Sequence, residues 1–186
     1  MSQSGKTDNI ETITINQESN TLAVGCKTGN VYLINLNNNR DLISASSSPA
    51  NETAENLVDG NINTKYYNRA QNSGVIVTLN GPATANEISI YSANDAYLRD
   101  PKEVIIYGTN DPIISNDNSP GLAENWTKIH HSTIEIPIER GKEFKGKFNN
   151  NNKFKSYKII FPYSRNQLNG IQIAELQLFE NGQNLI

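Results

Sequence analysis

A short polar turn in the segment VDGNINTKYYN carries the residues best suited to hold a metal ion. Asp59, Asn61 and Thr64 follow a D-x-N-x-x-T spacing around Gly60. Short side chains that bear oxygen, on a tight turn, suit a hard cation such as Ca²⁺, which prefers oxygen ligands. An ordinary D-G-N turn is the alternative, and the EF-hand pattern is not satisfied because the loop lacks its closing Glu.

The last apolar run, IQIAELQLFE at residues 171–180, contains a second unusual feature. Its two Ile residues are at odd-numbered positions and its two Leu residues at even-numbered positions, so in one regular strand the two pairs would face opposite sides. The alternation expected of a strand therefore breaks at Ala174 and Glu175. A β-bulge at this step would restore the core register, free a carbonyl and re-aim Glu175. The alternative is a surface Glu on an edge strand.

The elements that must position these residues are strands. Short β-rich runs alternate with Asn, Gly, Asp and Pro, which indicates an all-β sandwich or barrel. A helical turn is expected at TAENLV, just before Asp59, and polar loops at 108–126 and 149–152. The clearest strands are expected at 74–79, 86–93, 102–109, 126–131, 155–162 and 171–180.

The first forty residues form a separate pattern. Three short strands are expected at 13–15, 22–24 and 31–34, with turns at 17–20 and 27–30. The segment resembles one blade of a WD-repeat propeller, through the strands TLAVG and VYLINL, although the His and Trp-Asp landmarks and a second copy are missing. A single blade cannot bury its faces alone, so it must dock on something else or be the remnant of a longer ancestor. Residues 37–39 are the natural linker, which divides the chain into a blade-like segment at 1–39 and a sandwich at 40–186.

From about Leu42 to Glu180 the chain resembles the discoidin or coagulation-factor type C family, also called galactose-binding-like. The resemblance is carried by VDGNINT, by SANDAYLRDPKEVIIYGTNDP, by WTKI and by the A-E step of the last strand. It implies a jelly-roll β-sandwich stapled by one structural calcium ion. The implied metal ligands are Asp59, Asn61, Thr64 and Glu175, with the carbonyls of Asn56, Thr64 and Ala174. One departure is Tyr66, which stands where the family has Trp.

The resemblance also implies that ligands bind to loops at one end of the sandwich, here 66–69, 92–100 and 164–167. Aromatic faces suit the C–H side of a sugar ring, and planar polar groups suit its hydroxyls. Tyr97 is the aromatic most expected to be exposed, whereas one of Tyr66 and Tyr67 is expected to face the core. Arg99 has the alternative role of an ion-pair partner for Asp100 or Asp95. The candidate ligand-binding residues are Asn94, Asp95, Tyr97, Arg99, Tyr66, Asn68 and Arg165.

Composition excludes several classes of function. The net charge of −3 and the absence of a basic stripe argue against a nucleic-acid binder, and no apolar run has membrane-spanning length. Cys26 is the only cysteine, so no internal disulfide can form. The sequence shows no nucleophile, zinc or phosphate-binding motif. His130 and His131 are adjacent on an expected strand and therefore point to opposite faces, so they cannot bind one metal ion together.

The sequence thus predicts a non-catalytic binding module for carbohydrates or cell adhesion, with a glycan as its partner and Ca²⁺ as its structural cofactor. The alternative is a protein–protein interaction or assembly scaffold that uses the same loops. The N-terminal segment is a candidate for homo-oligomer formation or a larger assembly. No signal peptide is visible, so a cytoplasmic protein or export by another route is expected, while the family resemblance favours a surface or extracellular location.

Overall fold

The computed structural model describes residues 10–16, 21–27, 31–35, 40–41, 48–114, 123–167 and 170–186, which divide into the units Met1–Asn38 and Asn39–Ile186. The first unit is an antiparallel sheet of β1 (Ile10–Asn16), β2 (Thr21–Cys26) and β3 (Val31–Asn35), in that order. The expected N-terminal β-meander is confirmed. The turn expected at 17–20, most of the one at 27–30, the linker at 37–39 and the loop residues 115–122 lie outside the described residues.

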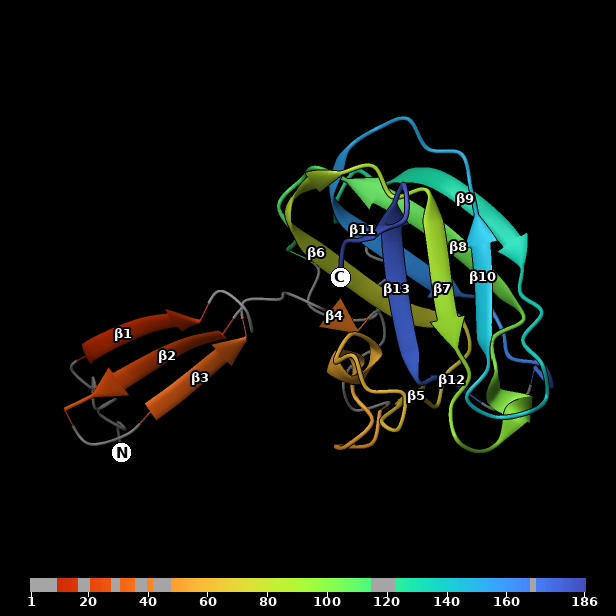
Figure 1. Ribbon diagram of the computed structural model, residues 1–186, viewed down its shortest axis with the longest axis horizontal. Helices are drawn as coiled ribbons and strands as arrows, with labels where there is room; N and C mark the ends of the chain where they lie inside the picture. Colours follow the sequence, from red (N-terminus) through yellow and green to blue (C-terminus); the bar gives the residue numbers. More distant parts are fainter. Residues whose placement is uncertain are drawn as a thin grey trace. The chain divides into compact units, whose positions relative to one another are not determined.

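The second unit is a β-sandwich, as expected, and Figure 1 shows its two layers. One sheet has the order β4 (Arg40–Asp41), β6 (Ser73–Ala83), β11 (Phe154–Phe161), β8 (Glu103–Thr109) and β9 (Thr127–Thr133). The facing sheet has the order β10 (Glu143–Lys147), β7 (Glu87–Tyr91), β13 (Glu175–Glu180) and β14 (Gln183–Asn184). A small third sheet pairs β12 (Ile171–Ile173) with β5 (Tyr66–Asn68).

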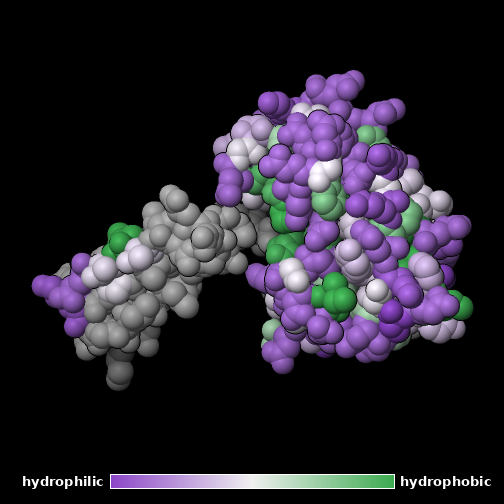
Figure 2. All heavy atoms as spheres, viewed as in Figure 1, coloured by the Kyte–Doolittle hydropathy of each residue, from purple (hydrophilic) through white to green (hydrophobic). Residues whose placement is uncertain are grey.

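The core fills the space between the two large sheets. Alternation along β8 turns Val104 and Ile106 inward, and Ile88 and Ile90 of β7 are buried in the same cluster. Each fully buried aliphatic side chain of this kind contributes roughly 2 kcal/mol through the hydrophobic effect. Strand β11 is buried along almost its whole length, because a second apolar cluster that includes Ile160 covers its outer face. The face drawn in Figure 2 is covered mainly by hydrophilic side chains, as expected for the solvent side of a sandwich.

The expected single strand at 171–180 is two strands. The chain pairs with β5 through Ile173 and Tyr66, bends at Ala174, and then pairs with β7 through Glu175 and Tyr91. The broken alternation in the sequence therefore marks a change of partner strand. This change keeps the apolar residues on both sides of the break in one core and buries Glu175 between them.

Strands β4, β5, β10 and β14 were not expected from the sequence. They are short, and β10 reads EFKGK, with charged residues that are typical of an edge strand. The turn expected before Asp59 is confirmed as the 3-10 turn η2 (Ala54–Leu57). Among the described residues, no helix is long and apolar enough to cross a membrane.

Candidate functional site

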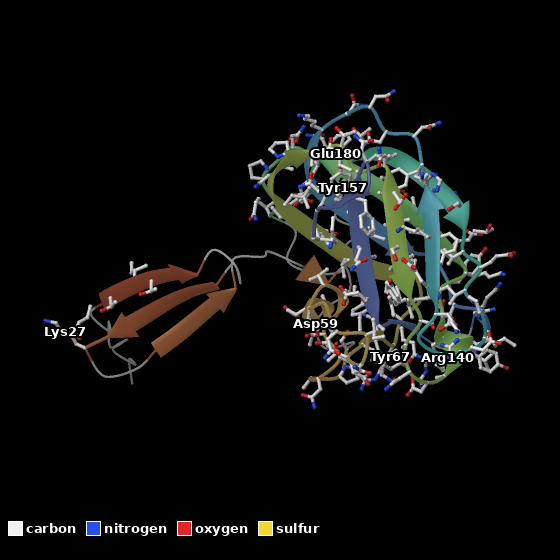
Figure 3. All side chains as sticks on the ribbon, viewed as in Figure 1. Lys27, Asp59, Tyr67, Arg140, Tyr157 and Glu180 are labelled. Carbon is white, nitrogen blue, oxygen red and sulfur yellow. The ribbon has the colours of Figure 1, made fainter. Side chains whose placement is uncertain are left out.

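Three loops meet at one end of the sandwich. The segment after β7 is joined to the loop at 162–167 by the backbone hydrogen bond from Arg165 N to Asp100 O, at 2.9 Å, and by a bridge between Pro101 and Ser164. The loop at 162–167 contacts the segment after β5, because Gln71 Nε2 donates to Ser164 Oγ at 3.0 Å. Figure 3 places Tyr67 and Arg140 at this end and Glu180 at the other. The sequence-based expectation that these loops lie together is confirmed.

The loop at 92–100 is held in a defined conformation by a buried amide and a lysine. Gln172 Nε2 on β12 donates to the Asp95 carbonyl at 2.6 Å and to Asp95 Oδ1 at 3.0 Å. Lys65 Nζ lies 2.8 Å from both carboxylate oxygens of Asp95, and its hydrogen bond lowers the pKa of that carboxyl group. The next residue, Ala96, has a φ of 38°, a left-handed conformation that costs energy without a glycine. These contacts fix the loop that carries most of the candidate ligand residues.

An arginine from a fourth segment anchors the base of the same loop. Arg140 Nη1 and Nη2 donate to the two carboxylate oxygens of Asp100 at 2.8 Å and 2.7 Å. Asp100 is fully buried, and Arg165 Nε lies 3.4 Å from the same carboxylate. A bidentate guanidinium–carboxylate pair fixes geometry as well as charge, so these residues position the loop.

The half-exposed aromatic surface of the site is made by Tyr67, Arg99 and Tyr97. The guanidinium carbon of Arg99 stands 4.4 Å from the centre of the Tyr67 ring. Tyr97 belongs to the 3-10 turn η3 (Tyr97–Arg99) and is 45% exposed, as the sequence suggested. Asn94 and Asp95, on the same loop, are also exposed. This loop therefore presents an aromatic ring, an amide and a stacked cation to solvent.

Three of the expected ligand residues need correction. Tyr66 is fully buried in the main core and Asn68 is also fully buried, so neither side chain can contact a bound sugar, and Tyr67 is the partly exposed one of the two tyrosines. Arg165 is turned toward Asp100 and also donates to the Ile136 carbonyl, which makes it a structural residue.

The ion pairs suggested as an alternative role for Arg99 do not form. Asp100 is paired with Arg140, Asp95 is paired with Lys65, and Arg99 stacks on Tyr67 instead.

Lys65, Arg140 and Gln172 hold the candidate loop and were not singled out from the sequence. Arg140 stands in a run of four cations and two acids between 139 and 147, which carries no sign of a distant partner. Gln172 stands between two core Ile residues, and strict alternation would have placed it on the solvent face. A polar residue inside an otherwise apolar strand was the one available signal.

The residues of the expected cation site lie together beside η2. Asp59 Oδ1 accepts from Asn61 N at 2.8 Å, and Asp59 Oδ2 accepts from Thr64 Oγ1 at 2.7 Å. Glu175 is 3% exposed, and the backbone N–H groups of Gly60 and Asn61 donate to its carboxylate. Asn56 lies in η2, which packs against β13, and Ala174 immediately precedes β13.

The electrostatics of this cluster fit a hard cation. Burial, with the Asp59 charge adding to it, raises the pKa of Glu175 to about 7. Its Oε2 is buried and has no hydrogen-bond partner among the described residues. Two carboxylates in contact, one of them with an orphaned oxygen, form a costly arrangement unless a proton or a cation lies between them. The donor set is entirely oxygen, which is the chemistry that Ca²⁺ prefers.

Comparison with solved structures identifies several β-sandwich modules with a similar fold. It is similar to the family 32 carbohydrate-binding module of NanJ from Clostridium perfringens, solved with galactose, at 20% identity and a TM-score of 0.58, covering 76% of this chain and 93% of that one. A further module, from a family 31 glycoside hydrolase of Clostridium perfringens, gives 18% identity and a TM-score of 0.60, covering 76% of this chain and 90% of that chain. Chitosan-binding module 1 of a chitosanase/glucanase from Paenibacillus sp. IK-5 gives 16% identity and a TM-score of 0.57, covering 77% of this chain and 95% of that chain. No family model and no curated protein matches the chain. At these identities the likeness is one of fold: the chain shares the β-sandwich fold of these modules.

Proposed function

We propose that this protein is a non-catalytic carbohydrate-binding module whose sugar site is the loop end of the sandwich. The observation that carries the proposal is the stack of Arg99 on Tyr67 beside the exposed Tyr97, on a loop locked by Gln172 and Lys65. Solved modules of the same fold are complexes with galactose, with N-acetylgalactosaminyl-β-1,3-galactose and with 4,5-unsaturated mannuronic acid, which supports this choice of ligand.

The chemistry of the loop end suits a sugar ring. Tyr97 offers an apolar face to the C–H side of the ring, and Asn94 and Asp95 offer groups that donate to and accept from hydroxyls. Arg99 is held by its stacking, so little side-chain entropy is lost when it binds. A pre-formed site of this kind binds without rearrangement of the backbone.

In this proposal Asp59 and Glu175 hold a structural Ca²⁺ ion, with Asn61 and Thr64 beside them. The ion would supply the positive charge that the two contacting carboxylates lack. It would also tie the segment after η2 to the start of β13, since these residues come from both elements. Binding to the folded state alone stabilises the fold by mass action.

A protein partner is the second candidate function. Leu98 is 42% exposed next to Tyr97, so the tip of η3 presents an apolar pair as well as an aromatic ring. Exposed aromatic and Arg side chains also serve as anchors of protein interfaces. Either role would place the module where its ligand is accessible, and a glycan ligand favours the cell surface or the exterior.

A glycan array probed with the full chain tests the proposal, with Tyr97→Ala and Arg99→Ala as site variants. We expect binding to a subset of glycans that free sugar competes away and that both variants weaken roughly tenfold. Binding that persists unchanged in both variants would place the sugar elsewhere. Failure of the wild-type protein to bind any glycan would leave the protein-partner candidate.

A further inference from the structure

A groove lies on the sandwich well away from the loop end. Its volume is about 730 Å³, within the usual range for ligand sites. It opens between β9 and β10, which are the edge strands of the two facing sheets (Figure 1). A smaller hollow of about 190 Å³ shares Ile129 and Asn149 with it and continues along the loop at 149–152.

Strand register shows that the groove and the loop site are at opposite ends. Glu87, which lines the groove, pairs with Phe179 and Lys147, whereas Tyr91 at the other end of β7 pairs with Glu175. At 3.3 Å per residue, the length of β7 separates the two ends by roughly 13 Å. One small sugar cannot occupy both sites.

The floor of the groove is an aromatic pair. The His130 ring stacks on the Phe148 ring, with centroids 5.2 Å apart and an angle of 23° between the planes. His130 Nε2 is 2.9 Å from Ser132 Oγ, which fixes the orientation of the imidazole. Burial, together with the charge of His131, lowers the pKa of His130, so its ring is neutral at pH 7. Ile129 adds an aliphatic surface next to this pair.

The walls of the groove are formed by asparagine side chains and by a carboxylate that is paired with lysines. Asn86 Nδ2 donates to Asn181 Oδ1 at 2.8 Å, and Asn181 N donates back to Asn86 Oδ1 at 3.0 Å. This reciprocal pair makes one wall rigid. The buried carboxylate of Glu87 lies 3.3 Å from Lys145 Nζ and 3.8 Å from Lys147 Nζ, so it is not an isolated charge. Asn149 also lines the groove, and its side chain is exposed.

We propose that this groove is a second sugar site, which takes a neutral hexose or N-acetylhexosamine ring and makes the module bivalent for glycans. The aromatic and aliphatic floor matches the C–H face of such a ring, and the amides, imidazole and carboxylate match hydroxyls, which both donate and accept. The paired charges favour a neutral ring over a phosphate or another strong anion. The inference extends the proposed carbohydrate binding to a separate site that does not require the loop end.

The test is a titration of the ¹⁵N-labelled full chain, followed by amide resonances, with galactose, N-acetylgalactosamine and N-acetylglucosamine as probes. Side-chain amides of Asn86, Asn149 and Asn181 report directly on the groove. We expect one or more probes to shift these resonances and the backbone amides of His130 and Phe148. The Asn149→Ala and His130→Gln variants should weaken this response roughly tenfold, and Tyr97→Ala should leave it unchanged.

Thermal melts of each variant separate lost binding from lost folding, and Asn149→Ala changes an exposed side chain that is expected to be neutral for stability. Shifts confined to the loop end would overturn the second site while leaving the proposed function intact. Shifts confined to the groove would support the second site and refute the loop site. If saturating concentrations of all three probes move neither set, the second site is refuted, and the glycan array decides the proposed function separately.

Discussion

Arg140 and Asp100 form a bidentate ion pair at the base of the loop site, with N–O distances of 2.8 Å and 2.7 Å. Asp100 is fully buried, and the Arg140 side chain is mostly buried. Because neither group can regain full hydration when the other is removed, the pair links loop geometry to stability. The residue that shapes the binding loop therefore comes from a segment some forty positions away.

Breaking this pair is expected to destabilise the fold. Asp100→Asn keeps the side-chain volume but leaves the mostly buried Arg140 without its counter-ion, and we expect the free energy of unfolding to fall by about 3 kcal/mol. Urea denaturation measures this change. Lys147→Ala is the control, since Lys147 is largely exposed and pairs with Glu87 at 3.8 Å, and it should change stability by less than about 0.5 kcal/mol. Equal effects in both variants would contradict the assignment.

Tyr97→Ala is expected to reduce sugar affinity without loss of stability. Truncating a stacking aromatic costs roughly 2 kcal/mol of binding, whereas a change at an exposed loop position alters stability by about 0.5 kcal/mol or less. Ile114→Ala is the matched control, because Ile114 is an exposed apolar side chain beyond the far end of β8. Calorimetric titration and thermal melts of the three proteins give both quantities. A large drop in the melting temperature of the Tyr97 variant would make Tyr97 a packing residue.

Calcium is expected to raise the melting temperature by several degrees. A ligand at a hundredfold excess over its dissociation constant stabilises the native state by about 2.7 kcal/mol. The measurement compares melts in excess Ca²⁺ and in chelator. Glu175→Gln should abolish the difference, while Glu180→Gln, at the other end of the same strand, should keep it. Identical wild-type melts in the two conditions would show that the carboxylate pair holds no metal.

His130 is expected to make stability depend on pH below 6.5. Its pKa is lowered from 6.5 in the fold, first by burial, so the unfolded chain binds more protons in that range. The contribution is fully present above pH 6.5 and is lost as the pH falls through the lowered pKa. Urea denaturation at pH 7.5 and at pH 5.5 measures it as the difference between the wild type and His130→Gln, in which the titration of all other groups cancels. An unchanged difference at the two pH values would contradict the prediction.

Gly170→Ala is expected to destabilise the join between β12 and β5. A Cβ at this position would lie 1.7 Å from Asn68 O and 2.6 Å from Arg69 Cα, and both are backbone atoms that cannot move aside. We expect a loss of about 3 kcal/mol, at the upper end of the range for overpacking. Gly81→Ala is the control, because nothing lies within 4 Å of its Cβ position. Matching urea curves for the two variants would refute the close contact.

The sequence by itself determined the β-sandwich, the turn before Asp59, the interruption at Ala174 and the exposure of Tyr97. Each of these rests on local information: alternation of apolar residues, turn chemistry, or one large aromatic in a polar loop. Tertiary structure alone decided that Tyr66 is in the core and Tyr67 outside, since period-two alternation fixes the difference between neighbours and not which of them faces inward.

Tertiary structure also decided which charges meet. Lys65 reaches Asp95 and Arg140 reaches Asp100 across thirty and forty positions of chain, and His130 of β9 stacks on Phe148, which directly follows β10 of the other sheet. Long polar side chains have no periodic signature, and their partners depend on which loops the strand order brings to the same end. Only the packing of the two sheets fixes that order, so the loop site and the groove become visible only in three dimensions.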